Sequence, residues 1–408
     1  MVKFSHLADI HLGSWKEPKL RELSERSFAE AIKSSIAHSV DFVLISGDLF
    51  NTSLPPIESL KLAVAELKKL KDAGMPVYTI AGSHDFSPSG KTMLEVLEEA
   101  ELVVNVCKGE IVEGKLKLRF TTDKKTGAKI TGMIGKKGML EKKYYEELIT
   151  ENLENEKGFK IFMFHTALSE LKPEELEQME AAPLSLLPAG FDYYAGGHVH
   201  IVKEASIGRH RNVVYPGPVF PNSFSELEKL GSGGFYIYDD GRLRHEKIEI
   251  HPVVSININC EHKTPQQATE AMTDEISGKS FKDAIVLLRL FGRLETGKTS
   301  EINTAKVIEM LQEKGAYFVM KNTGKLATKE FEEVKIKADT AEEAEALVVQ
   351  EHVGQVKSLQ LTPEEEKELV HNLMLLLDKA KEEGEKQSDY DSRIISEAEK
   401  AFQKQVTD

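Results

Sequence analysis

Residues 2–13 read VKFSHLADIHLG, an apolar run that leads into an acidic residue and a histidine two positions apart. Residues 2–7 predict a strand, because a short apolar run bounded by a turn is typical of a buried strand. On extended backbone, Asp9 and His11 would project to the same face, which is the spacing that chelation of one cation requires. The segment therefore predicts a strand that carries two candidate metal ligands at its carboxyl end.

Four later segments repeat this order of a predicted strand followed by an acid or a histidine. In open α/β sheets, ligand groups converge at the carboxyl ends of the strands. We therefore expect all five turns to contribute to one site. The four segments are Gly47-Asp48, His84-Asp85 after Gly82, His165 after the apolar residues 161–164, and Gly197-His198-Val199-His200.

Strands and helices alternate over the first hundred residues, which predicts an α/β fold. Short strands in a meander, two further buried strands and a hairpin follow, and the hairpin closes a first domain over residues 1–250. The predicted strands are residues 2–7, 41–46, 77–81, 160–164 and 193–195, the meander is 109–133, the hairpin is 234–250 with its turn at 239–241, and the helices are 24–40 and 58–73.

The remainder predicts two more parts. Residues 251–335 have a β-α-β-α-β order that indicates a small α+β domain, and residues 336–408 read as a helical tail. One tail helix carries an apolar stripe of Leu369, Leu373, Leu376 and Leu377, which would pack on a partner helix from this chain or another. The predicted elements are strands 253–259, 284–291 and 317–321, helices 265–277, 301–312, 341–352, 363–386 and 393–404, and a polar break at 387–391.

Composition excludes several classes of protein. The chain has 408 residues, enough for two or three domains. Its net charge of −14 argues against a polycation that coats nucleic acid, although a local basic face or bound cations could still contact phosphates. No apolar run is long enough to span a bilayer, and His6, Asp9 and His11 do not suit a secretory signal. We expect a cytoplasmic protein without a disulfide or a zinc–thiolate site, because Cys107 and Cys260 stand alone.

The candidate ligands are carboxylates and imidazoles, a set that suits hard to borderline divalent cations. Asp48 is short and anionic at a strand end, so it could bridge two cations and offset their repulsion. A single D-x-H or H-x-H is more often a core or loop histidine than a metal site. Five such turns in one chain favour a two-metal centre.

In this order, D-x-H, G-D, the Gly82–Asp85 turn, a lone histidine and G-H-x-H resemble the motifs of the calcineurin-like metallophosphoesterase superfamily. The segments ADIHLG at 8–13 and GDLF at 47–50 are similar to one branch, the archaeal meiotic-recombination-eleven (SbcD-type) nuclease subunit of the double-strand-break repair complex. The motifs lie within the first 250 residues. The resemblance implies a β-sandwich flanked by helices, a small α+β capping domain and a helical C-terminal tail.

The resemblance also implies the chemistry and the partners. It implies a DNA exonuclease and endonuclease in which two divalent ions, manganese above all, hydrolyse phosphodiesters by in-line attack of a bridging hydroxide. His84 would be the acid or stabiliser beside the leaving oxygen. The partners would be DNA ends, a second copy of the chain and an SMC-like coiled-coil ABC ATPase. The second copy would bind through residues 58–73 and the following loop, and the ATPase would bind the C-terminal helices. Asp9, His11, Asp48 and His200 would hold one ion, and Asp48, Ser83, His165 and His198 the other.

Two positions depart from the pattern of the family. Ser83 stands where members usually carry asparagine, and a hydroxyl is shorter and a weaker neutral ligand than an amide oxygen. Asn51 stands where the repair nucleases often carry histidine, and it cannot act as an imidazole acid. We expect a more weakly held second ion and a less efficient exonuclease.

Basic residues flank the predicted site and are candidates for positioning DNA phosphates. We predict that Asn51, Lys136, Lys137, Arg209 and Arg211 contact DNA, with Lys142 and Lys143 nearby. Residues 292–299 also match the phosphate-binding pattern G-x-x-x-x-G-K-T, but no later strand supplies the acid that would hold magnesium, so we interpret this match as a coincidence.

Two other functions stay open from the sequence. One is a phosphodiesterase or phosphatase for small substrates, for which the second domain and the tail would be superfluous. The other is a scaffold that joins an ABC ATPase to DNA ends while its own nuclease site is weakened, an idea that Ser83 and Asn51 support.

Overall fold

The computed structural model describes residues 2–86, 92–136, 141–173, 176, 179–328, 362–379, 381 and 387–406. The chain divides into two compact units. The first comprises Met1–Ile256, Lys279–Leu288 and Glu309–Lys321, and the second comprises Asn257–Gly278, Arg289–Ile308 and Asn322–Asp408. The helix predicted at 341–352 and the boundary predicted at 335 lie outside the described residues, so the three-part division stays a prediction.

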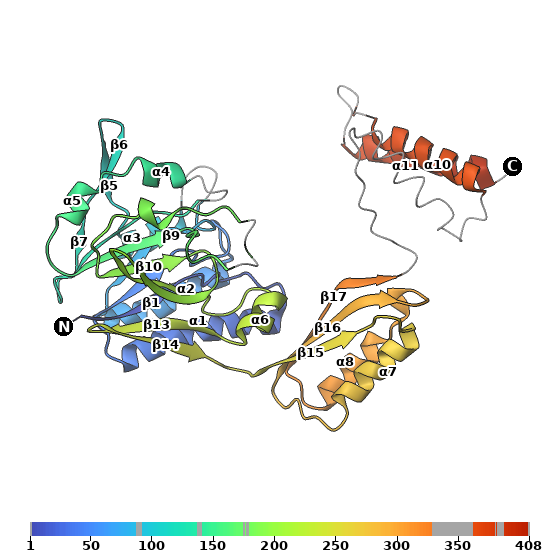
Figure 1. Cartoon of the computed structure of the whole chain (residues 1–408), viewed down its shortest axis with the longest axis horizontal. Helices are drawn as coiled ribbons and strands as arrows, with labels where there is room; N and C mark the ends of the chain where they lie inside the picture. Colours follow the sequence, from blue (N-terminus) through green and yellow to red (C-terminus); the bar gives the residue numbers. More distant parts are fainter. Residues whose placement is uncertain are drawn as a thin grey trace. The chain divides into compact units, whose positions relative to one another are not determined.

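Two six-stranded sheets form the centre of the first unit (Figure 1). In the first sheet, β1 to β4 run parallel and a hairpin adds two antiparallel strands beside β1. Its order is β14 (Arg242–Ile248), β13 (Gly233–Asp239), β1 (Lys3–Leu7), β2 (Phe42–Ser46), β3 (Val77–Ile80) and β4 (Val104–Asn105).

The second sheet has a parallel centre and antiparallel edges. The predicted meander at 109–133 does not form one sheet, because β5 (Gly109–Val112) and β6 (Lys115–Leu118) pair only with each other. The order of the second sheet is β11 (Val202–Ile207), β12 (His210–Pro216), β10 (Tyr193–Gly197), β9 (Lys160–His165), β8 (Lys129–Gly132) and β7 (Thr121–Thr122).

Alternating side chains explain why the two sheets face each other. In β2, Phe42 and Leu44 share a buried cluster with Met163 of the second sheet, whereas Val43 and Ile45 face the opposite side. A strand with apolar residues on both faces must be covered on both faces. This arrangement confirms the predicted α/β class with a β-sandwich flanked by helices.

Helices cover the outer faces of the sandwich. The first sheet is covered by α1 (Pro18–Ala37), α2 (Ile57–Asp72) and α3 (Met93–Glu99), whose apolar residues join those of β2 in one cluster. On the second sheet lie α4 (Lys142–Glu146), α5 (Glu151–Glu154) and η3 (Leu184–Leu186). Helix α1 begins six residues before the predicted start at 24, because Pro18 occupies its first turn and the Glu17 side chain accepts a hydrogen bond from the Lys19 N–H. The short α6 (Phe224–Leu230) precedes β13.

A three-stranded sheet follows, in the order β15 (Val253–Asn259), β16 (Ile285–Leu294) and β17 (Phe318–Thr328), with helices α7 (Pro265–Ile276) and α8 (Thr304–Glu313). The segment with the phosphate-binding pattern leads into the 3₁₀ turn η4 (Thr299–Glu301). There the Lys298 N–H donates to the Glu301 carboxylate at 3.2 Å. A carboxylate at this position would repel phosphate, which supports interpreting the motif as a coincidence.

The last two helices, drawn in red in Figure 1, pack against each other. They are α10 (Pro363–Leu377) and α11 (Gln387–Val406). Leu369 and Leu376 of the predicted stripe are buried, as is Ile394 of α11, whereas Leu377 is 66% exposed. The polar break predicted at 387–391 is wrong, since α11 begins at Gln387.

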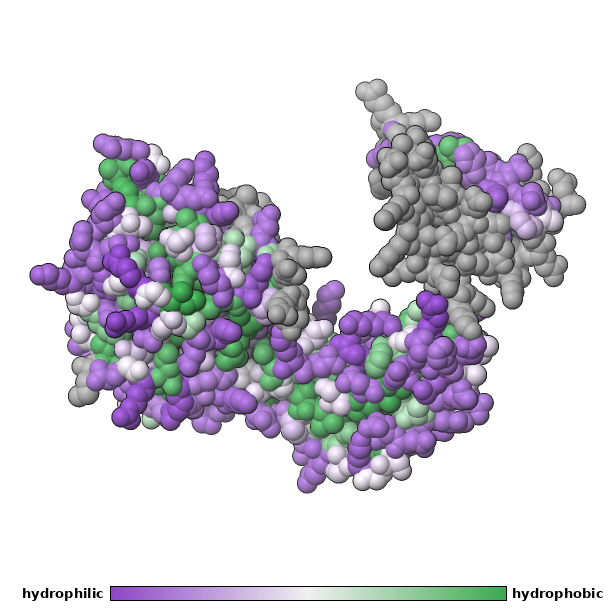
Figure 2. All heavy atoms as spheres, viewed as in Figure 1, coloured by the Kyte–Doolittle hydropathy of each residue, from purple (hydrophilic) through white to green (hydrophobic). Residues whose placement is uncertain are grey.

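The surface is largely polar. Figure 2 shows hydrophilic residues over most of the visible face, with hydrophobic residues between them in small groups. Within the described part of the chain, no helix has the length and apolar composition to cross a bilayer.

Candidate metal centre

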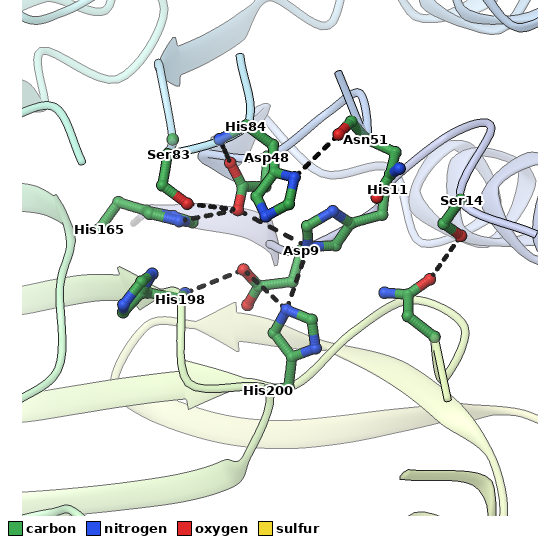
Figure 3. A network of polar contacts seen from close by, with 12 residues as sticks. Asp9, His11, Ser14, Asp48, Asn51, Ser83, His84, His165, His198 and His200 are labelled. Carbon is green, nitrogen blue, oxygen red and sulfur yellow. Dashed lines mark hydrogen bonds and ion pairs between the residues drawn. The ribbon is translucent and has the colours of Figure 1, made fainter. Parts of the chain in front are cut away.

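The candidate ligands lie together at one edge of the sandwich, where strands from both sheets end (Figure 3). Because β1, β2 and β3 run parallel, the loops that follow them emerge at the same edge. Strands β9 and β10 are also parallel, and their carboxyl ends supply the remaining histidines. The structure thus brings together all the metal ligands predicted from sequence, which are Asp9, His11, Asp48, Ser83, His165, His198 and His200, with His84 beside them.

The backbone of this edge is strained. Asp9, His11 and Asp48 have φ angles of 51°, 48° and 52°, and His198 and His200 have 98° and 49°. Residues other than glycine rarely adopt positive φ, and such strain concentrates at functional sites. The loops after β1 and β2 hold one another in this conformation, because the His11 N–H donates to the Asp48 carbonyl at 2.9 Å.

Two glycines allow the loops to approach so closely. A Cβ at Gly47, where φ is 86°, would overlap the His165 ring. A Cβ at Gly82 would overlap both the backbone and the carboxylate of Asp48. Each glycine therefore makes room for a candidate ligand that comes from another strand.

Asp48 lies at the centre of the cluster. Its Oδ2 is 3.1 Å from His165 Nε2 and 3.6 Å from His11 Nε2. The Ser83 hydroxyl donates to the same oxygen at 3.4 Å, and the His84 backbone N–H donates to Oδ1 at 2.7 Å. Oδ2 therefore faces the side chains of the cluster, whereas Oδ1 contacts the backbone of the loop after β3.

Three groups of side chains bring their ligand atoms within 4.8 Å of one another. They share members, so they form one continuous cluster. The groups are Asp9, His11 and His200; Asp9, Asp48 and His165; and His11, Asp48 and His84. The first group holds three of the four ligands predicted for one ion, and the second joins Asp9 to two ligands predicted for the other ion. The third includes His84, to which the resemblance assigned the role of acid.

Burial and neighbouring charges have opposing effects on the pKa values of Asp48 and His165. Burial opposes ionisation of Asp48, but the charge and hydrogen bond of His165 lower the pKa of Asp48 well below its ordinary value. Burial would likewise lower the pKa of His165, yet Asp48 raises it to about 10. Burial lowers the pKa of His11 to about 3 and raises that of Asp9. Without a cation, a proton on His165 Nε2 lies between imidazole and carboxylate, where a metal ion could replace it.

The donor set fits divalent cations. His11 Nε2 and His200 Nε2 lie 3.0 Å apart, so two lone pairs would meet unless a proton or a cation lies between them. The Nδ1 atom of buried His11 has no hydrogen-bond partner in the described structure. The cluster offers carboxylate and imidazole ligands and no thiolate, the combination preferred by cations such as Mn²⁺.

Comparison with known proteins identifies the family. Residues 2–202 match the family model described as calcineurin-like phosphoesterase. The chain carries a calcineurin-like phosphoesterase domain. This confirms both the superfamily predicted from the motifs and the prediction of a metal-dependent phosphoesterase.

Sequence relatives agree with this family. The DNA double-strand break repair protein Mre11 of Archaeoglobus fulgidus is 26% identical over 71% of this chain and 68% of its own length. The protein of the same name from Sulfurisphaera tokodaii is 32% identical over 62% of this chain and 65% of its own length. The uncharacterized metallophosphoesterase YhaO of Bacillus subtilis is 25% identical over 62% of this chain and 61% of its own length. The predicted resemblance to archaeal repair nucleases is thereby confirmed.

The predicted DNA contacts of the phosphoesterase domain lie at different distances from the cluster. Lys136 follows Gly135, which packs against the His165 ring, and its Nζ donates to the Tyr144 hydroxyl at 2.8 Å. Asn51 also lies beside the cluster, because its backbone carbonyl accepts a hydrogen bond from His84 Nδ1 at 2.8 Å. Lys137 lies outside the described residues. The DNA contacts themselves stay predictions.

Arg209 and Arg211 are placed differently. Arg209 lies in the turn between β11 and β12, at the end of β11 that is remote from His200. At about 3.3 Å per residue, the length of β11 alone separates them by roughly 20 Å. The Arg209 guanidinium is 3.8 Å from the Glu154 carboxylate. Arg211 follows the first residue of β12 and lies at the same remote end.

Two residues of the first unit support the cluster, although the sequence assigned them no role. Asp85 is buried and accepts backbone hydrogen bonds from Asp48 at 2.9 Å, Gly82 at 2.9 Å and Phe50 at 3.2 Å. It therefore holds the loops after β2 and β3 together. Burial and the nearby Asp48 charge raise the pKa of Asp85 to about 7. The second residue, Glu226, contacts His200.

Proposed function

We propose that this chain is a divalent-metal-dependent DNA nuclease of the double-strand-break repair type, with exonuclease and endonuclease activity. The observation that carries the proposal is the cluster of two carboxylates and several histidines where both sheets end, in a calcineurin-like phosphoesterase domain. The similarity to proteins named DNA double-strand break repair protein Mre11 supports DNA as the substrate. We propose the cytoplasm as the place where the chain acts.

Two cations, Mn²⁺ in our proposal, would occupy the cluster. The first ion would be held by Asp9, His11, Asp48 and His200, and the second ion by Asp48, Ser83, His165 and His198. When bound, the pair would activate a bridging water for in-line attack and neutralise the charge that develops on the phosphodiester.

The residues of the chain have separate tasks in this proposal. The Asp48 carboxylate would lie between the two cations and offset their mutual repulsion. Because a carbonyl oxygen only accepts, the His84 Nδ1 that contacts Asn51 carries a proton, and Nε2 is free to face the leaving oxygen. Lys136 lies one residue from the glycine that packs on His165, so its ammonium could move from Tyr144 to a DNA phosphate.

One observation keeps the scaffold function as a second candidate. The Ser83 hydroxyl donates its proton to Asp48 at 3.4 Å. Its oxygen keeps lone pairs for a cation, but a hydroxyl reaches less far and is a weaker neutral ligand than the amide usual in the family. A site with a weakly held second ion would bind DNA ends better than it cleaves them.

Partners are proposed from the tail and from α2. The coiled-coil ABC ATPase would bind α10 and α11, where Leu375, Leu377 and Ile395 remain 57%, 66% and 59% exposed. A second copy of the chain would pack on α2 and the loop that follows it, and Ile57 at the start of α2 is 74% exposed. Deleting residues 361–408 should abolish capture of the ATPase coiled coil in a pull-down and leave the nuclease folded. Undiminished capture would show that the ATPase binds another surface of the chain.

The direct test of the function compares substrates. With Mn²⁺, the full chain should cleave a linear DNA duplex much faster than a small phosphodiester such as bis-p-nitrophenyl phosphate, and Asp48→Ala should cleave neither. Faster turnover of the small diester would favour a small-substrate phosphodiesterase. Tight binding of duplex ends without cleavage would favour the scaffold.

A further inference from the structure

Glu226 contacts a candidate ligand of the first ion, although no sequence motif marks it. Its Oε1 lies 3.2 Å from His200 Nδ1. Its Oε2 accepts a hydrogen bond from the Asn222 backbone N–H at 2.8 Å. Because both oxygens are engaged, the carboxylate is held in one orientation against the His200 ring.

The local sequence explains how Glu226 reaches this position. It lies in the first turn of α6, where the Ser223 hydroxyl caps the helix by accepting the Glu226 N–H at 3.1 Å. Phe224 and Leu227 are buried and anchor α6 in the core. The Glu226 side chain therefore points from the start of α6 back toward the cluster.

The same segment is tied to the loop that follows β1. The Ser14 hydroxyl donates to Asn222 Oδ1 at 2.9 Å, a contact drawn in Figure 3. The Trp15 indole N–H donates to the Pro221 carbonyl at 3.1 Å, and the Ser14 N–H donates to the His11 carbonyl at 3.0 Å. Residues 221–226 therefore link the D-x-H loop to His200.

The carboxylate also decides which nitrogen of His200 carries the proton. A carboxylate only accepts, so Nδ1 of His200 donates to it, and in the neutral imidazole Nε2 keeps its lone pair. That Nε2 atom lies 3.0 Å from His11 Nε2 and 3.7 Å from Asp9 Oδ1. Histidines that bind metals commonly donate their other ring N–H to such a carboxylate.

We propose that Glu226 is a positioning residue for the first ion, acting through His200. It fixes both the orientation of the imidazole ring and the tautomer that leaves Nε2 free to bind a divalent cation. The inference rests on the proposed function, because it concerns the first ion of that site.

The test uses the full chain and three variants. Glu226→Ala removes both acceptors. Glu226→Gln keeps the shape but has one acceptor oxygen for two donors, the Asn222 N–H and His200 Nδ1–H. Glu204→Gln is the matched control, since Glu204 is an exposed acid on β11, four residues from His200. Calorimetric Mn²⁺ titration measures affinity, and circular dichroism of the metal-free proteins checks folding.

We expect Mn²⁺ affinity at the first ion to fall by about 10- to 100-fold in Glu226→Ala, by less in Glu226→Gln, and not at all in Glu204→Gln. Nitrogen-15 NMR of labelled histidine should show protonated Nδ1 at His200 in the unchanged metal-free chain and loss of that preference in Glu226→Ala. If Glu226→Ala does not fold, the Mn²⁺ affinities of Glu226→Gln and Glu204→Gln decide whether Glu226 positions His200.

Two outcomes would overturn the inference alone: unchanged affinity in both Glu226 variants, or an equal loss in Glu204→Gln, which would assign the effect to net charge. If the unchanged chain binds no Mn²⁺, the proposed function fails together with this inference.

Discussion

Lowering the pH should destabilise this protein through His6, a buried histidine that joins the two sheets of the sandwich. His6 belongs to β1, and its Nδ1 lies 2.9 Å from the hydroxyl of Tyr193 on β10. Burial lowers the pKa of His6 from 6.5 to about 3, against a smaller opposing effect of a hydrogen bond with the Gly196 backbone. His6 therefore stays neutral in the folded protein at pH values at which it is protonated in the unfolded chain.

The sign and size of the effect follow from proton linkage. The stability that depends on neutral His6 is fully present above pH 6.5 and is lost as the pH falls toward 3. At about 1.4 kcal/mol per pH unit, the free energy of unfolding should drop by roughly 2 kcal/mol between pH 7 and pH 5 on account of His6 alone. The complete loss near pH 3 would approach about 5 kcal/mol.

Urea unfolding of the metal-free protein at pH 7 and pH 5 measures this change. The comparison is with His6→Gln, whose amide can still bond to the Tyr193 hydroxyl but does not titrate. His11 and His198 also have pKa values lowered by burial, but both proteins contain them, so the difference isolates His6. The original protein should lose about 2 kcal/mol more than the variant. An identical pH dependence in the two proteins would refute the reasoning.

Three substitutions test the metal centre. Asp48→Ala should abolish Mn²⁺-dependent cleavage in a protein that remains folded by circular dichroism, because both ions lose a ligand; near-normal cleavage would exclude a bridging role. Ser83→Asn should tighten the second ion by about 10- to 100-fold in calorimetric titration, because an amide oxygen reaches farther than a hydroxyl; unchanged affinity would mean that another group already completes the shell. His84→Gln should slow single-turnover cleavage by about 10²- to 10⁴-fold while Mn²⁺ affinity stays nearly constant; a parallel loss of affinity would make His84 a ligand, as its place beside His11 and Asp48 allows.

Much of the sandwich could be predicted from local sequence. The apolar runs within β2 and β9 predict burial on both faces, and every residue of both strands is buried. Exposed edge strands could not be recognised in this way. Strand β11 lacks buried residues and gains its structure from pairing with β12, so it carries no hydrophobic signal.

The candidate cluster could be recognised in the sequence because each predicted ligand lies at the end of a strand or a few residues after it. The residues that support the ligands act differently. Asp85 acts through three backbone N–H groups, and a backbone contact leaves no pattern in the sequence. Glu226 lies 26 positions after His200 and meets it only through the packing of α6. Spacing along the chain predicts ligands, whereas their supporting groups depend on tertiary structure.

Manganese in crystals of the full chain tests the central claim most directly. Anomalous diffraction at the manganese edge, from crystals soaked in Mn²⁺, should reveal two ions in the cluster at the sheet edge, one on each side of the Asp48 carboxylate. The first ion should contact Asp9, His11 and His200, and the second should contact His165 and His198. Manganese absent from this cluster, or a single ion that does not contact Asp48, would contradict the two-metal account.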